Sequence, residues 1–95
     1  MTLMELVASH NEEAVLADGF DEAFIGMVDR CGLPAPVVLY DKGKCIQILI
    51  DRDGMTYEDA EEFFEINVLG SWVGDYMPMF LVDMQDGEMR LQNSA

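Results

Sequence analysis

The chain has 95 residues, which is the size of one small domain, and 51% of them are hydrophobic, enough for a single core. Its 19 Asp and Glu against five Lys and Arg give a formal charge of −14, which argues against direct binding to nucleic acid or to an anionic membrane. No apolar run approaches the ~20 residues of a membrane span. We therefore expect one soluble acidic domain over residues 1–95, with a loose tail at 92–95.

Two features of the sequence are typical of a cytosolic protein. The N-terminus lacks both the basic region and the hydrophobic segment of a secretory signal. Cys31 and Cys45 are the two cysteines, and we interpret both as reduced, small apolar residues rather than as a disulfide.

The first twenty residues predict a helix. The pattern Thr2-x-x-Glu5 resembles a capping box, and apolar residues follow it at helical spacing until Gly19. Asn11 is a point at which the segment can restart as a second short helix.

A further N-terminal helix is predicted from Asp21, a typical N-cap residue, to Gly32, which occupies the position of a left-handed C-terminal residue. Phe24, Val28 and Cys31 form one apolar stripe along it. The Pro-containing segment 33–36 then ends the helix.

A short β-branched run at 37–40 predicts a buried strand. The next segment, 41–53, has two interpretations. Ile46, Ile48 and Ile50 alternate as in the arm of a β-hairpin, whereas Asp41 can cap a helix that ends before Gly54.

The rest of the chain predicts one helix and a strand pair. Thr56-x-x-Asp59 resembles a second capping box, which opens a helix that runs to about Gly70. A strand is expected at 79–82, and the Asp86-Gly87 turn signal predicts an edge strand at 88–91. The expected fold is thus α+β, with two N-terminal helices, a helical hairpin in the middle, and a small antiparallel sheet with helices on one face.

The most prominent charge feature is an acidic helix face formed by Glu58, Glu61, Glu62 and Glu65, which spans about 10 Å. Such a face can imitate the phosphates of nucleic acid and occupy the basic groove of a nucleic-acid-binding protein. The simpler interpretation is an ordinary solvated helix face, and charge runs are usually that.

The sequence contains no recognisable catalytic, cofactor-binding or metal-binding motif. Segment 51–54 (Asp-Arg-Asp-Gly) fails as a calcium loop, because the first and twelfth ligand positions fall on Leu49 and Ala60. His10, the one histidine, has no nucleophile motif to serve, and with the two cysteines it does not make a zinc site. We therefore assign no catalytic residue, cofactor or metal.

Two further positions are candidates for structure or binding. Asn67 falls on or near the apolar side of the acidic helix, so we expect a buried amide that ties the helix end to a loop; a ligand contact is the alternative. Trp72, Tyr76 and Met77 cluster after it, and they suit either a protein contact or closure of the core.

Several segments between residues 20 and 82 carry a resemblance to a known family: 21–26 (DEAFIG), 37–41 (VVLYD) followed by 44–46 (KCI), 54–68 (GMTYEDAEEFFEINV), Gly70, 73–74 (VG) and 78–81 (PMFL). On these segments the chain resembles a family of short uncharacterised proteins of tailed bacteriophages and prophages. The resemblance implies a helix over 41–53 and a phage origin, but no activity.

Three functions are expected from residues and resemblance together. The first is a non-enzymatic protein in the host cell cytosol that binds and modulates a host or phage protein; a homodimer is left open. The second, a DNA-mimic inhibitor of a basic nucleic-acid-binding protein, is a special form of the first. The third is a small-molecule-binding domain or enzyme.

Overall fold

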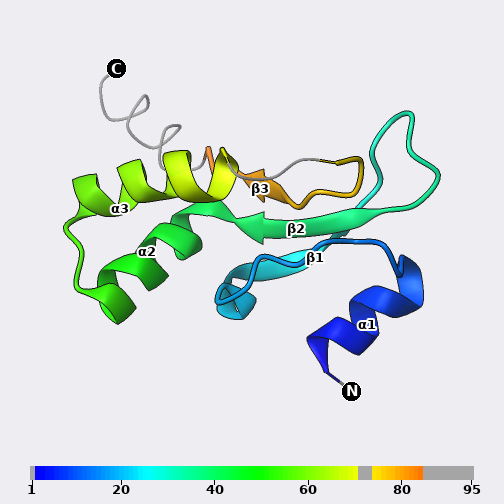
Figure 1. Cartoon of the computed structure of the whole chain (residues 1–95), viewed down its shortest axis with the longest axis horizontal. Coiled ribbons are helices and arrows are strands. Elements are labelled where there is room, and N and C mark those ends of the chain that lie inside the picture. Colours follow the sequence, from blue (N-terminus) through cyan, green and yellow to red (C-terminus); the bar gives the residue numbers. More distant parts are fainter. Residues whose placement is uncertain (1, 71–73, 85–95) are drawn as a thin grey trace.

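The computed structural model describes residues 2–70 and 74–84, which form three strands with helices at both ends of the sheet (Figure 1). In chain order the elements are α1 (Leu3–His10), the 3₁₀ turn η1 (Asp21–Ala23), β1 (Phe24–Val28), β2 (Val37–Asp41), α2 (Lys42–Asp53), α3 (Tyr57–Phe63), the π-helical segment η2 (Phe64–Leu69) and β3 (Met79–Leu81). The predicted edge strand 88–91 and the predicted tail 92–95 lie outside the described residues. Within the described ranges, no helix has the length and apolar character needed to cross a membrane.

The sheet is mixed, with β2 in the middle of the order β1-β2-β3. β1 runs antiparallel to β2, with Met27 opposite Val38, and β3 runs parallel to β2, with Phe80 opposite Tyr40. A parallel pair needs a long crossover connection, and α2 and α3 supply it beyond one end of the sheet (Figure 1). α1 lies toward the other end.

The predicted arrangement is therefore wrong. One helix, not two, precedes the strands, and the sheet is mixed rather than antiparallel. The expected helical hairpin also fails to match, because its second arm leaves α geometry after Phe63 and both arms belong to a crossover between parallel strands.

The first helix begins as its cap predicts but ends early. The Thr2 hydroxyl accepts a hydrogen bond from the Glu5 N–H at 3.1 Å. The helix stops before Asn11, whose side-chain NH₂ donates to the Pro36 carbonyl at 2.9 Å and whose side-chain oxygen accepts from the Glu13 N–H at 3.0 Å. These bonds replace a helical turn, so the chain neither continues the helix to 19 nor restarts one at Asn11.

The second predicted helix is a strand. Asp21 opens only the 3₁₀ turn η1, and the backbone becomes extended at Phe24 (φ −64°, ψ 130°). Gly26 disfavours a helix here by about 1 kcal/mol relative to Ala, and pairing with β2 gives the same backbone groups hydrogen-bond partners. Gly32, with φ +88°, lies in the connection between β1 and β2 instead of ending a helix.

Segment 41–53, which had two interpretations, is the helix α2. The Asp41 carboxylate accepts a hydrogen bond from the Lys44 N–H at 3.1 Å, and Gly54 ends the helix in the left-handed conformation (φ +68°). Cys45, Ile46 and Leu49 lie in the core.

The capping residue of the next helix is also confirmed, because the Thr56 hydroxyl accepts from the Asp59 N–H at 3.2 Å. After Phe63 the helix widens into η2, whose hydrogen bonds span five residues. Ala60, Phe64 and Val68 face the core from these two segments.

The core is centred on Tyr40 and on two rings, Phe64 and Phe80. The Phe64 and Phe80 ring centroids lie 5.0 Å apart edge to face, and Phe80 stacks on Tyr40 at 5.7 Å. The buried Tyr40 hydroxyl accepts a hydrogen bond from the Ala17 N–H at 2.8 Å, which attaches the N-terminal segment to the sheet. Burial raises the pKa of this phenol above its ordinary value.

We expect Tyr40→Phe to lower the free energy of unfolding by about 1–3 kcal/mol, because the buried Ala17 N–H loses its acceptor. Urea unfolding of both proteins measures the change. An unaltered midpoint would show that this hydrogen bond is not a net contributor.

Candidate functional site

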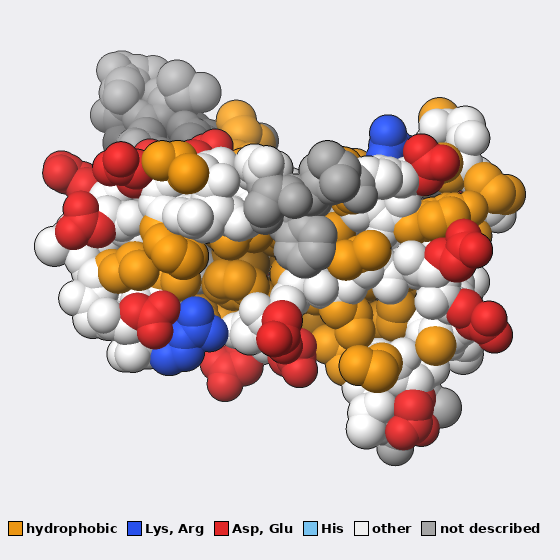
Figure 2. Space-filling view, viewed as in Figure 1, with side chains coloured by type: hydrophobic (Ala, Val, Ile, Leu, Met, Phe, Trp, Pro, Cys, Tyr) orange, Lys and Arg blue, Asp and Glu red, His pale blue; other side chains and the backbone are white. Residues whose placement is uncertain are grey.

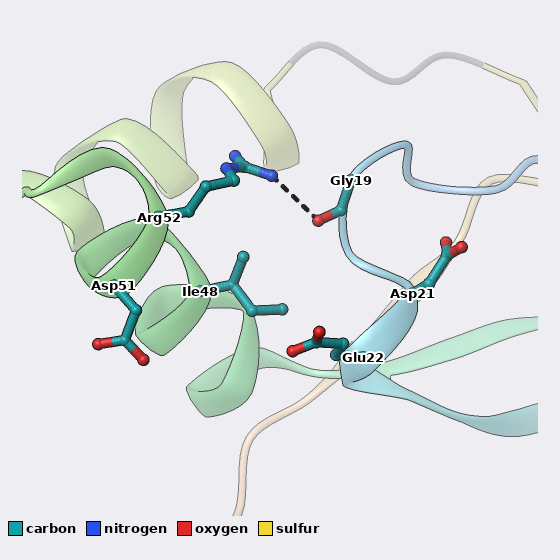
Figure 3. Close-up of a pocket in the computed structure, with 6 residues that line it drawn as sticks. All are labelled: Gly19, Asp21, Glu22, Ile48, Asp51 and Arg52. Atoms are coloured by element: carbon teal, nitrogen blue, oxygen red, sulfur yellow. Dashed lines mark hydrogen bonds between the residues drawn. The ribbon is translucent and has the colours of Figure 1, made fainter.

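A groove between η1 and α2 brings together residues from two distant parts of the sequence. It has a volume of about 430 Å³ and is lined by Gly19, Asp21, Glu22, Ile48, Asp51 and Arg52 (Figure 3). Four of these six residues have charged side chains. We call it the acidic groove.

Arg52 is the cation of the acidic groove, and its guanidinium is already bound within the chain. It donates to both carboxylate oxygens of Asp53, at 3.2 and 3.1 Å, and to the Gly19 carbonyl at 3.1 Å. It also lies 5.7 Å from the centre of the Phe20 ring. Glycine is favoured at position 19 because φ is +88°, and a Cβ there would also lie 2.8 Å from Arg52 Nη1, so the guanidinium would have to shift.

Three carboxylates remain around the apolar side chain of Ile48. Glu22 points toward Ile48, whereas Asp21 and Asp51 point away from it on opposite sides (Figure 3). Asp51 accepts a hydrogen bond from Gln47 at 2.9 Å. Between described residues, none of the three forms an ion pair, so the groove has a negative excess.

A second hollow of about 150 Å³ extends the acidic groove along α2. It shares Glu22, Ile48 and Asp51 with the first and adds Lys44 and Gln47. The described residues contain no group of three or more His, Cys, Asp or Glu that could hold a metal ion. The geometry of the groove suits contact with a cationic side chain: its aliphatic part packs on Ile48, and its charged head meets the carboxylate of Glu22, the one that points toward Ile48.

The predicted acidic face on α3 is only partly available. Glu58, Glu61 and Glu62 are exposed. Glu65, in η2, is ion-paired with Lys42, with 2.6 Å between Nζ and Oε1. The sequence did not show this pairing, because the two residues are 23 positions apart.

The prediction of a buried Asn67 is wrong, because this residue is exposed. The π-helical turn has more residues per turn than an α-helix, so Val68 follows Phe64 on the inner side and Asn67 turns outward.

Of the predicted aromatic cluster, Trp72 lies outside the described residues. Tyr76 and Met77 are half-buried, and the Tyr76 carbonyl accepts a hydrogen bond from the Val15 N–H at 3.1 Å. Tyr76 therefore connects the loop before β3 to the N-terminal segment.

Cys45 and His10 are a nucleophile and a base candidate, and both have contacts within the chain. Burial, with a smaller contribution from the Asp41 charge, raises the pKa of the Cys45 thiol to about 12, which keeps it protonated at neutral pH. His10 is exposed, and its Nδ1 lies 3.1 Å from the Leu6 carbonyl oxygen of its own helix.

Sequence reasoning missed the acidic groove entirely. Its two walls come from residues 19–22 and 48–52, and nothing in a sequence indicates that these segments meet. The one local signal was Gly19, whose positive φ and missing side chain allow the approach of Arg52.

Comparison of the chain with protein-family models, with curated proteins and with solved structures finds no match.

Proposed function

We propose that this chain is a non-enzymatic binding protein that docks on a basic surface of another protein, of the host or of the phage, in the host cell cytosol, and so modulates that partner. The observation that carries the proposal is the state of the charges in the acidic groove. Arg52 is bound by Asp53 and Gly19, while Asp21, Glu22 and Asp51 have no ion pair between described residues.

The same imbalance extends over the surface. On the face shown in Figure 2, Asp and Glu side chains greatly outnumber Lys and Arg, and hydrophobic side chains form the floor of its hollows. A surface of one sign attracts a partner of the other sign over long range and raises the association rate, whereas close contacts determine how long the complex lasts. A basic protein surface is the partner that a charge of −14 favours.

A nucleic-acid mimic is the special form of this proposal in which the partner's basic surface is a nucleic-acid groove. Glu58, Glu61 and Glu62 favour it, because they are exposed along one side of α3. The Lys42–Glu65 ion pair weakens it, because the fourth carboxylate of the predicted face is already neutralised.

The third hypothesis, a small-molecule site, draws support from the volume of the acidic groove, which falls in the range of such sites. Its lining argues against it, because small-molecule sites are mostly apolar with a few polar groups, and four of the six lining residues here have charged side chains.

Two variants with equal charge changes test the proposal. One carries Asp21→Asn, Glu22→Gln and Asp51→Asn in the acidic groove, and the other carries Glu58→Gln, Glu61→Gln and Glu62→Gln on α3. Partners are captured from host lysate at low salt, and the affinity of each captured protein is measured for the native chain and both variants. We expect steeply salt-dependent binding, weakened about tenfold or more by the groove variant and less by the α3 variant.

Other results of this experiment would favour the mimic or contradict the proposal. A larger loss with the α3 variant, together with competition by DNA, would favour the mimic. Salt-independent binding that survives both variants and is lost with Trp72→Ala would contradict electrostatic docking and favour an apolar contact around Tyr76 and Met77. Capture of no protein at low salt would also contradict the proposal.

A further inference from the structure

The strand β1 has one edge that no described strand occupies, because the sheet order places β2 on its other side alone. A five-residue strand is about 16 Å long, and an unpaired edge presents backbone N–H and C=O groups to solvent. A bulge interrupts the pairing between Phe24 and Gly26, so the regular part of β1 is Gly26–Val28.

A groove of about 470 Å³ lies between β1 and α1. Leu6 and His10, one helical turn apart, line it from α1, and Phe24, Gly26 and Met27 line it from β1. Pro36 and Asp29 complete the lining. Leu6 is 41% exposed although it is apolar, so the groove has an uncovered apolar wall.

His10 adds a polar imidazole to the lining of this groove. Its Nδ1 lies 3.1 Å from the Leu6 carbonyl oxygen, which can only accept a hydrogen bond. Ser9 Oγ lies at the same distance of 3.1 Å from Nδ1. The tautomer with the proton on Nδ1 donates to the carbonyl, and its Nε2 is then an acceptor for a donor on an incoming chain.

The charge of the groove identifies the occupant. Among the residues that the structure describes, its lining contains the carboxylate of Asp29 and no Lys or Arg. A second copy of the chain would bring another charge of −14 to the same place, and the two copies would repel each other. A segment with positive charges meets attraction instead.

We propose that the β1–α1 groove binds an extended segment of a partner protein, in which apolar residues alternate with Lys or Arg, as a fourth strand added to the edge of β1. Backbone hydrogen bonds to β1 supply the pairing, and the alternation directs every second side chain toward Leu6, Phe24 and Met27. The basic residues between them are attracted by the net charge of −14 that the chain carries. This inference rests on the proposed function in that the partner is basic, but it uses a different surface.

The test uses a nonapeptide of alternating Lys and Val with blocked termini, titrated into the isotopically labelled full chain and followed by NMR. We expect shifts of the backbone amides of β1 and of Leu6 and His10. A peptide of the same sequence and charge, with N-methyl groups on alternate residues along the pairing edge, should bind about tenfold more weakly, because it has lost strand hydrogen bonds.

Two exposed apolar residues of α1 provide a matched pair of variants. Leu6→Gln removes the wall of the groove and should weaken binding about fivefold or more, whereas Met4→Gln makes the same kind of change at a residue that does not line this groove and should leave affinity unchanged. Both sites are exposed, so both variants should fold.

Equal affinity of the two peptides, or of the two variants, would overturn strand addition. So would shifts confined to the acidic groove of α2, but that outcome would leave the proposed basic-partner docking intact. Absence of binding at about 1 mM peptide would overturn the inference as well.

Discussion

Phe64→Ala is expected to lower the free energy of unfolding by about 3–5 kcal/mol, the range for truncating a buried aromatic side chain. Phe64 has no exposed surface, and its ring contacts the rings of Phe20 and Phe80 at centroid distances of 6.4 and 5.0 Å. It joins η2, the N-terminal segment and β3, so the cavity would disturb three parts of the fold. Urea unfolding followed by circular dichroism measures the loss.

The neighbouring residue provides the control. Phe63 has the same side chain but is 38% exposed, so Phe63→Ala should cost clearly less than Phe64→Ala. Equal losses for the two variants would contradict the orientation of α3 and η2, because the structure directs only Phe64 into the core.

The two cysteines are expected to differ strongly in reactivity. Burial raises the pKa of the Cys45 thiol to about 12, so at pH 8 its thiolate fraction is about a thousandfold smaller than that of a cysteine of ordinary pKa. Cys31 is exposed. Mass spectrometry after iodoacetamide treatment should find Cys31 modified and Cys45 unmodified in the native protein.

Unfolding provides the comparison for this measurement, because it exposes Cys45 and returns its pKa to the ordinary range. In concentrated urea both cysteines should therefore be alkylated at similar rates. Rapid modification of Cys45 under native conditions would show that the helix α2 does not cover this thiol, or that the region opens frequently.

Three of the capping signals in the sequence are confirmed, because the bonds that make them are local, whereas those at Asn11 and Asp21 are not followed by an α-helix. Thr2, Asp41 and Thr56 each accept a hydrogen bond from the backbone N–H three residues later. Gly54 ends α2 with a positive φ that other residues rarely adopt. The formal charge of −14 is likewise a property of composition alone, and it remains the basis of the proposed function.

Contacts between residues far apart in the sequence determined the elements that local patterns did not predict. Segment 24–28 has an apolar pattern short enough for helix or strand, and the β-branched strand at 37–41 provides the pairing that makes it a strand. Asn11 ends α1 through a bond to Pro36, 25 residues away. Hydrogen bonds of this range depend on the folded chain, so a local pattern does not reveal them.

The candidate sites also divide into features that the sequence shows and features that only the folded chain shows. The sequence identified Glu58, Glu61 and Glu62 as an exposed helix face, but only the folded chain pairs Glu65 with Lys42. The acidic groove and the β1–α1 groove each join walls that lie far apart in the sequence. Composition thus determines the sign and size of the charge of this chain, and the tertiary structure determines where on its surface the grooves lie.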